Sequence, residues 1–242
     1  MGLGWASIRG VLVTMPVIGL QRGVILRTMT TGHPAHSRQD MFCDRCGAYA
    51  IRRVALDGEQ GTFACGACGR CDTRRVLPLH IVTGASGAGK TTIITIVQRT
   101  LVECGVFDKD ALWATDWDMV YNNFFRIASS LAQGGRRAVV IGTILPEFLT
   151  GLSDRDLVGT IHYANLHCDD ASRERRLLTR RTWDVPARAF IEKHQAFAAW
   201  LLAEASTAFD PPMPTFDTTQ STPDEVAAQV VRWVRSTIHV NA

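Results

Sequence analysis

Short apolar runs alternate with longer amphipathic segments along the last two thirds of the chain. We expect a β-strand at each run, because a short continuous apolar run suits a strand that is buried on both faces. The predicted strands are Leu79–Thr83, Ala111–Thr115, Ala138–Ile141, Ile161–Leu166 and Thr215-Phe216.

The segments between these runs carry apolar residues at helical spacing, and we predict helices there. The last helix has the clearest start, since Thr222 and Glu225 form a capping box with Pro223 at the first helical position. Repeated β-α units predict an α/β fold, a parallel sheet of about five strands with helices on both faces. The predicted helices are Thr92–Glu103 (closed by Gly105), Asn122–Gln133, an arginine-rich segment after Leu166, Phe190–Ala205 and one from Pro223 onward.

Residues 1–75 do not follow this alternation. Val11–Leu20 is apolar, but it has about half of the roughly twenty residues that are needed to cross a bilayer. No small-residue cleavage site of a secretory signal follows Leu20. We therefore expect residues 1–40 to be a disordered extension, or a start placed too far upstream, with Met29 or Met41 as the true start. A short strand or an interaction tail is the alternative.

Five of the seven cysteines lie close together in the next segment. Cys43, Cys46, Cys65 and Cys68 form two Cys-x-x-Cys-Gly elements, whose spacing fits one Zn²⁺ held by four thiolates. Cys71 follows Cys68 at the same interval and could replace it or remain free. Four thiolates leave no open coordination position, so we interpret the site as structural. The pattern also favours a reducing cytosol, and hence a cytoplasmic protein, over disulfides.

A hairpin is expected between the two cysteine pairs, with Asp57-Gly58 at its turn. Its strands would fall within Ala48–Leu56 and Thr62–Ala64. The segment 41–75 resembles a zinc ribbon. Because so small a module has almost no apolar core, we expect metal binding to fold it.

The chemistry of the larger part, residues 76–242, begins at Gly84-Ala85-Ser86-Gly87-Ala88-Gly89-Lys90-Thr91, a complete GxxxxGK[ST] motif between a predicted strand and a predicted helix. The glycines let the backbone N–H groups point inward, and the helix N-terminus adds partial positive charge. We expect Lys90 to reach the β- and γ-phosphates of ATP, and the Thr91 hydroxyl to bind Mg²⁺. Residues 84–91 and Thr92 are the predicted nucleotide-binding residues.

A carboxylate for the metal is expected after the second strand. The third strand ends in Ile141-Gly142-Thr143, without the acidic residue that most ATPases place there. Asp116 and Asp118, at the predicted end of the second strand, are the candidates to replace it. Residues two apart at a strand end point the same way, so both carboxylates are predicted to face the γ-phosphate.

An arginine cluster follows the fourth strand. Arg173, Arg176 and Arg180 lie three and four residues apart, so on a helix they would share one face. Several guanidinium groups on one face can clamp a triphosphate and stabilise charge during phosphoryl transfer. A solvated basic surface is the other interpretation.

Residues Leu79–Ser236 resemble the P-loop small-molecule kinases related to nucleoside monophosphate kinases, which include gluconate, shikimate and chloramphenicol kinases. The likeness is carried by GASGAGKT, DWD, CDDASRERRLLTRR and FDTTQSTPDEVA. By likeness to shikimate-type kinases, Asp116 would join the Mg²⁺ shell and Asp118 would face the acceptor. In chloramphenicol-type kinases an aspartate at this place acts as the base, so the two roles could be exchanged.

The same resemblance implies that Arg173 and Arg176 belong to a lid that closes over ATP, and that Asp217–Ser221 lies near the adenine. It names no acceptor, and the zinc ribbon departs from the usual members of the group.

Three functions agree with these features. The first is a kinase that phosphorylates a small molecule such as a nucleotide, a sugar or an antibiotic. The second is a nucleic-acid or protein kinase whose ribbon grips a polymer, and the third is a nucleotide-dependent switch or ATPase. A net charge of +3 is too small to indicate nucleic-acid binding, and Tyr49 and Phe63 make a thin stacking platform, so the second is not favoured. The expected partner is a small-molecule acceptor, with no membrane.

Overall fold

The computed structural model describes residues 42–49, 51–112, 116–180 and 188–239. All of them belong to one compact unit, Arg38–Ala242. The expectation for residues 1–40 lies outside the described residues. Within the described part, no helix combines the length and the apolar character that a membrane span requires.

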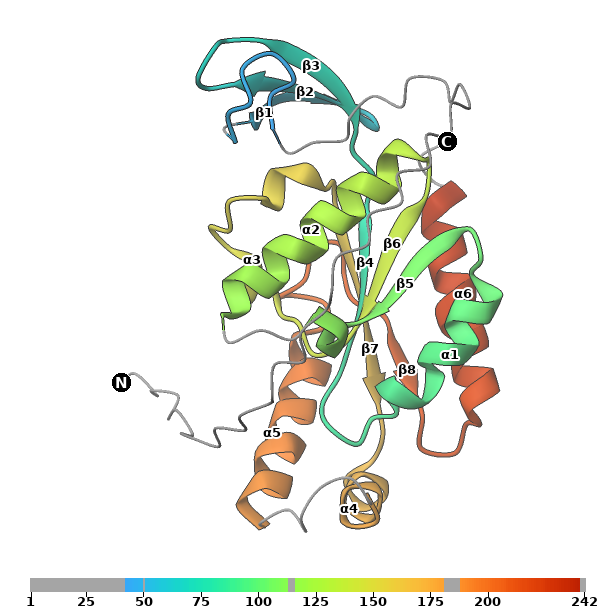
Figure 1. Ribbon diagram of the computed structural model, residues 1–242. Coiled ribbons are helices and arrows are strands. Elements are labelled where there is room, and N and C mark those ends of the chain that lie inside the picture. Colours follow the sequence, from blue (N-terminus) through green and yellow to red (C-terminus); the bar gives the residue numbers. More distant parts are fainter. Residues whose placement is uncertain (1–41, 50, 113–115, 181–187, 240–242) are drawn as a thin grey trace, which may run out of the picture. The chain divides into compact units, whose positions relative to one another are not determined.

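A five-stranded parallel sheet forms the centre of the fold (Figure 1). Its central strand has five buried residues in succession, as expected for a parallel sheet that is covered on both faces. The strand order is β5-β6-β4-β7-β8, and every neighbouring pair is parallel. The strands are β4 (Leu79–Thr83), β5 (Cys104–Asp108), β6 (Arg137–Ile141), β7 (Ile161–His167) and β8 (Thr215–Asp217).

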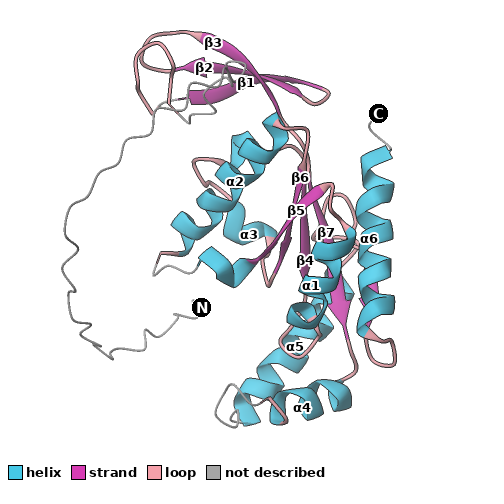
Figure 2. Cartoon of the chain, turned by 45° about the vertical axis from the view of Figure 1, so that its right-hand side comes forward, coloured by secondary structure: helices cyan, strands magenta, loops and turns pink. Residues whose placement is uncertain are grey.

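Helices cover the two faces of this sheet, which confirms the predicted α/β fold (Figure 2). α1 (Lys90–Thr100) and α6 (Pro223–His239) share one apolar core with one face of the strands. α2 (Trp117–Gln133), α3 (Pro146–Leu149) and α5 (Arg188–Glu204) share the other. Among the described residues, this part of the chain also contains α4 (Asp170–Leu178) and the 3-10 segments η1 (Lys109–Leu112) and η2 (Arg155–Leu157).

The predicted second strand, Ala111–Thr115, is wrong. The strand lies earlier, at β5, and α1 already ends at Thr100. Gly105 suggested a helix end, but it lies within β5, where a Cβ would collide with the side chain of Leu131 on α2. The glycine therefore permits close packing between a helix and the sheet, and it ends no helix.

A three-stranded antiparallel sheet precedes the parallel sheet and agrees with the predicted ribbon. β1 (Ile51–Asp57) and β2 (Gln60–Cys65) form the expected hairpin, and Gly58 at its turn has φ 54°. A third strand, β3 (Cys71–Arg75), which we did not predict, pairs with β2 and leads directly into β4.

The ribbon contacts the amino ends of the parallel strands. Arg137, the first residue of β6, donates to the carboxylate of Glu59 in the ribbon. The backbone N–H of Arg75 donates to Gln133, the last residue of α2, at 3.1 Å. The carboxyl ends of the same strands lie at the opposite end of the sheet, and GASGAGKT follows β4 there.

Candidate active site

The glycines of GASGAGKT adopt conformations that other residues rarely take. Gly84, Gly87 and Gly89 have φ angles of 145°, 83° and 92°. A Cβ on Gly84 would also lie 2.5 Å from the carbonyl oxygen of Leu166 in β7. The loop therefore passes tightly over the sheet and opens directly into α1 at Lys90, so its N–H groups lie at a helix N-terminus.

Lys90, at the end of this loop, is surrounded by buried groups and by other positive charges. Its ammonium donates to the carbonyl oxygens of Gly84 at 2.6 Å and Ala85 at 3.0 Å. Burial, followed by the positive charge of Arg173, lowers the pKa of Lys90 to about 7. An anion beside Lys90 would favour its charged form, so the site is prepared for negatively charged groups such as phosphates.

A cavity of about 550 Å³ opens in front of the loop. Its walls come from five places: the phosphate loop with α1, the end of β5 with the segment after it, the end of β6, α4 with the loop after it, and the loop after β8 with the start of α6. The lining side chains with charges or hydroxyls are Ser86, Lys90, Thr91, Thr92, Asp108, Lys109, Asp110, Thr143, Arg176, Arg180, Thr218 and Ser221.

Two arginines of the cluster face the cavity, and a third is buried. Arg176 and Arg180 line the cavity. Arg176 also donates to the carbonyl oxygen of Gly87 at 3.3 Å and to that of Thr218 at 2.6 Å, so it links the phosphate loop to the loop after β8.

Arg173 corrects the prediction of a shared lid face. Its side chain is fully buried behind the phosphate loop and donates to the carbonyl oxygens of Ser86 at 3.1 Å and Cys168 at 2.8 Å. It therefore holds the loop in shape, and it does not line the cavity as Arg176 does. Arg181 lies outside the described residues.

Asp116 and Asp118 belong to the start of a helix, which corrects their predicted place at a strand end. Asp116 is the N-cap of α2, and its carboxylate accepts from the backbone N–H groups of Asp118 at 2.9 Å and Met119 at 3.3 Å. Asp118 is exposed in the first turn. The period-2 geometry therefore does not apply to this pair.

The carboxylates that do line the cavity, among the described residues, are those of Asp108 and Asp110. Asp108 ends β5, and its carboxylate accepts from the backbone N–H of Asp110 at 3.0 Å. We missed both residues because β5 was placed too late. The available signal was an Asp-Lys-Asp sequence directly after the short apolar run that ends in Phe107.

His194 on α5 is a further contact of the loop that the sequence did not reveal. Its Nδ1 accepts from the backbone N–H of Ser86 at 3.4 Å, which requires the tautomer with the proton on Nε2. Burial, followed by the positive charges of Lys90 and Arg173, lowers the pKa of His194 to about 4. His194 is therefore neutral at physiological pH and able to accept this bond.

The four predicted ligand cysteines come together in the ribbon. The Sγ atoms of Cys43, Cys46, Cys65 and Cys68 all lie within 4.8 Å of one another. Two of the pairs are separated by 3.6 and 3.7 Å. A tetrahedral zinc ion with Zn–S bonds of about 2.3 Å requires sulfur pairs separated by about 3.8 Å. Cys71 lies outside this group, with its Sγ 3.8 Å from the carbonyl oxygen of Gly69.

The two cysteine turns have the same backbone geometry. Gly47 and Gly69 both have φ 71°, and each donates its N–H at 2.8 Å to the carbonyl of the first cysteine of its pair. The backbone N–H of Cys46 lowers the pKa of the Cys43 thiol to about 7, whereas burial and the neighbouring thiols raise the pKa of Cys46, so the four thiols titrate as one group. The residues present therefore fit a four-thiolate zinc site.

No protein-family model and no curated protein match the sequence. Solved structures that are similar include a sugar kinase from Janibacter sp. HTCC2649, with a TM-score of 0.46 and 13% identity over 66% of this chain and 95% of that chain. A gluconokinase from Sinorhizobium meliloti 1021 has a TM-score of 0.43 and 14% identity over 70% and 99%. A thymidylate kinase from Candida albicans has a TM-score of 0.44 and 12% identity over 68% and 92%.

Proposed function

We propose that the chain is an ATP-dependent phosphotransferase that moves the γ-phosphoryl group to a hydroxyl or phosphate of a small molecule. The observation that supports this most directly is the cavity in front of the phosphate loop. The phosphate loop, four cationic side chains and the carboxylates of Asp108 and Asp110 all line it. Such a cavity has the groups for a triphosphate and the carboxylates for a metal ion and an acceptor.

Residues of the loop would bind the nucleotide. The N–H groups of residues 84–91 would hold the phosphates, and Lys90 would contact the β- and γ-phosphates. Arg176 and Arg180 would stabilise the charge that develops on the transferring group. The loop from Thr218 to Ser221 lines the same cavity beside Arg176, which supports its predicted place near the adenine.

Mg²⁺ would be held by oxygen ligands that the cavity already contains. The Thr91 hydroxyl and one carboxylate of Asp108 or Asp110 are hard donors of the kind that this ion prefers. The bound ion would neutralise charge on the β- and γ-phosphates. The second carboxylate would orient the acceptor and take its proton.

Asp118 remains a candidate for an acceptor contact. Burial, followed by the carboxylates of Asp118 and Asp110, raises the pKa of Tyr121 to about 12. Tyr121 is therefore within electrostatic reach of both aspartates, and its ring stacks on that of Trp117, so the start of α2 forms a region next to Asp110. We propose that the acceptor binds along this region.

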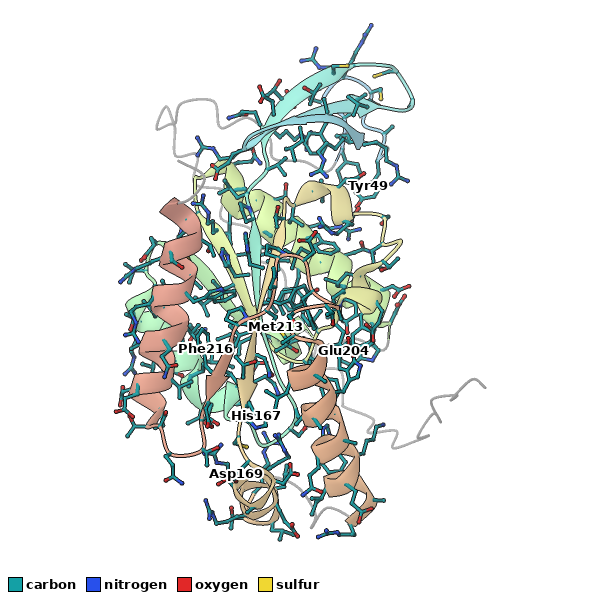
Figure 3. The ribbon with its side chains drawn as sticks, turned by 180° about the vertical axis from the view of Figure 1, so that it is seen from behind. Tyr49, His167, Asp169, Glu204, Met213 and Phe216 are labelled. Atoms are coloured by element: carbon teal, nitrogen blue, oxygen red, sulfur yellow. The ribbon has the colours of Figure 1, made fainter. Side chains whose placement is uncertain are left out.

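The described residues of the ribbon do not line the cavity in front of the phosphate loop. Figure 3 shows Tyr49 of the ribbon and Asp169, at the start of α4, at opposite ends of the sheet. A polymer held by the ribbon would have to extend along the whole length of β4 to reach the phosphate loop. We propose instead that residues 41–75 form a structural zinc module and that residues 76–242 form the kinase domain.

The decisive experiment measures ADP release from ATP and Mg²⁺ with a panel of nucleosides, nucleotides, sugars and aminoglycoside-like antibiotics. One class of acceptor should raise the rate well above acceptor-free hydrolysis, and mass spectrometry should show that acceptor with one added phosphate. Hydrolysis that no acceptor stimulates would favour a switch or ATPase. A chain that binds no nucleotide would refute the proposal.

A further inference from the structure

Lys109 is a cavity residue to which the proposed chemistry above gives no role. It follows β5, between the two aspartates, and lines the same cavity as Lys90. Its side chain is only 15% exposed. The ammonium lies 3.2 Å from a carboxylate oxygen of Asp110 and 4.1 Å from the centre of the Trp117 ring. The lysine is therefore held in one place, unlike a mobile surface lysine.

The end of β6 is shaped around the stem of Lys109. A Cβ on Gly142 would collide with Cβ of Lys109 and lie 3.2 Å from its Cγ and Cδ. The N–H of Gly142 donates to the carbonyl of Val82 in β4 at 3.0 Å, so this backbone cannot easily move away. The glycine stands where most ATPases carry a carboxylate, and here it leaves room for a lysine side chain.

Lys109 and Lys90 are placed to contact the same bound anion. Both side chains line the cavity in front of the phosphate loop, Lys90 from the start of α1 and Lys109 from the segment after β5. An ammonium has three N–H donors, and one carboxylate partner with one aromatic face does not use all of them. An anionic oxygen between the two lysines would therefore be contacted from the β4 side by Lys90 and from the β5 side by Lys109.

We propose that Lys109 is a second phosphate-binding lysine, which donates to an oxygen of the γ-phosphoryl group. This inference rests on the proposed function. During transfer, the bond from the γ-phosphorus to the β–γ bridging oxygen breaks and a bond to the acceptor oxygen forms, while the acceptor proton passes to an aspartate. Lys109 keeps its own proton and stabilises the charge on the γ-oxygens. The γ-phosphate is favoured over an anionic acceptor because Lys109 lines the same cavity as Lys90, which belongs to the phosphate loop.

The test compares the binding of two nucleotides in the absence of any acceptor. Lys109→Met keeps the length of the stem and its packing against Gly142 and Trp117, and removes only the charge. By calorimetry, the variant should bind the non-hydrolysable analogue AMP-PNP at least about tenfold more weakly, as expected for one lost charge-assisted hydrogen bond. Its affinity for ADP should stay within about twofold of wild type. Lys90→Met, which loses contacts to both phosphates, should weaken both ligands.

Two further variants separate a phosphate contact from a structural role. Lys109→Arg should restore part of the preference for AMP-PNP over ADP, since it restores the charge. Gly142→Ala should lower the same preference, because its methyl group displaces the stem of Lys109. Melting temperatures check that each variant is folded.

The outcomes are distinct. If Lys109→Met weakens AMP-PNP and ADP equally, or neither, the inference is wrong while the proposed function stands. If Lys109→Met binds both nucleotides as tightly as the wild type but binds an anionic acceptor more weakly, Lys109 belongs to the acceptor site. That result would also overturn the inference. If the wild-type chain binds neither nucleotide, the proposed function fails and the inference falls with it.

Discussion

The hydroxyl of Tyr49 donates to the carboxylate of Asp154 and lies 3.0 Å from each of its oxygens. Tyr49 belongs to the ribbon, whereas Asp154 lies between α3 and β7 and is almost fully buried. Arg126 of α2 donates to the same carboxylate at 2.7 Å and lies over the Tyr49 ring. One buried aspartate thus joins the ribbon to the helix that begins beside the proposed acceptor region.

Tyr49→Phe should destabilise the chain by about 1 kcal/mol, because it removes one hydrogen bond and leaves Arg126 to pair with Asp154. Asp154→Ala should cost more, about 2 to 3 kcal/mol, since it leaves the donors of Tyr49, Arg126 and Ser153 without this acceptor. Thermal or urea unfolding of the zinc-loaded protein measures both changes. Equal costs for the two variants would show that Arg126 adds nothing to this contact.

The purified protein should contain about one Zn²⁺ per chain, as expected for one four-thiolate site. Cys68→Ser should lose the metal, because it removes one ligand of the group within 4.8 Å. Cys71→Ser is the matched control, and it should keep the metal. Metal analysis after dialysis decides the matter, and a reversed result would make Cys71 the fourth ligand.

ATP binding above neutral pH should take up about one proton, since Lys90 has a pKa of about 7 without nucleotide and bound phosphates raise it. At pH 8 the side chain would be mostly neutral before binding and charged afterwards. ATP affinity should therefore fall as the pH rises above 7. Calorimetry in two buffers with different ionisation enthalpies measures the proton directly.

Lys90→Met is the control for this experiment. It should abolish both the proton uptake and the turnover, while the melting temperature stays close to that of the wild type. Proton uptake that persists in the variant would assign the titration to another group.

Arg176→Ala should lower kcat by about tenfold or more and change the Kd for ATP less, because its contacts matter most as charge moves to the transferring group. Arg173→Met should behave differently. It removes buried donors from two carbonyl oxygens, so we expect a loss of stability of about 2 to 4 kcal/mol. Steady-state kinetics and unfolding curves together separate the two roles. An unchanged kcat in Arg176→Ala would favour a solvated basic surface.

Asp108→Asn and Asp110→Asn should each reduce phosphoryl transfer, by about 10²–10⁴ for whichever residue acts as the base. Asp116→Asn is an informative comparison, because asparagine caps a helix about as well as aspartate and removes only the charge. We expect it to leave transfer and its Mg²⁺ dependence nearly unchanged. A strong loss of Mg²⁺ dependence in Asp116→Asn would instead support the assignment made from the sequence.

The features that the sequence predicted correctly are local ones. The phosphate loop, β4 at Leu79–Thr83 and the capping box before α6 each depend on a few neighbouring residues. The four cysteines could also be assigned, because the geometry of a metal site restricts their spacing. Such features can be recognised in the sequence without knowledge of the tertiary structure.

The features that could not be predicted depend on distant contacts. Gly105 could not be distinguished from a helix end without Leu131, which packs against it from α2. Nothing in the arginine-rich segment shows that Arg173 would be buried under the phosphate loop and Arg176 would reach Thr218. Asp108 and Asp110 were missed because the error at Gly105 moved the strand, and with it the expected carboxylates.

The small apolar cluster of Phe63, Val76 and Leu157 bears on how such a chain could evolve. Phe63 belongs to the ribbon, and Leu157 belongs to the larger part. A descendant that lost residues 41–75 would expose Leu157 and leave Asp154 without its tyrosine. The ribbon therefore could not be lost in a single deletion without further changes. Its loss would require compensating substitutions at Leu157 and Asp154 in the same lineage.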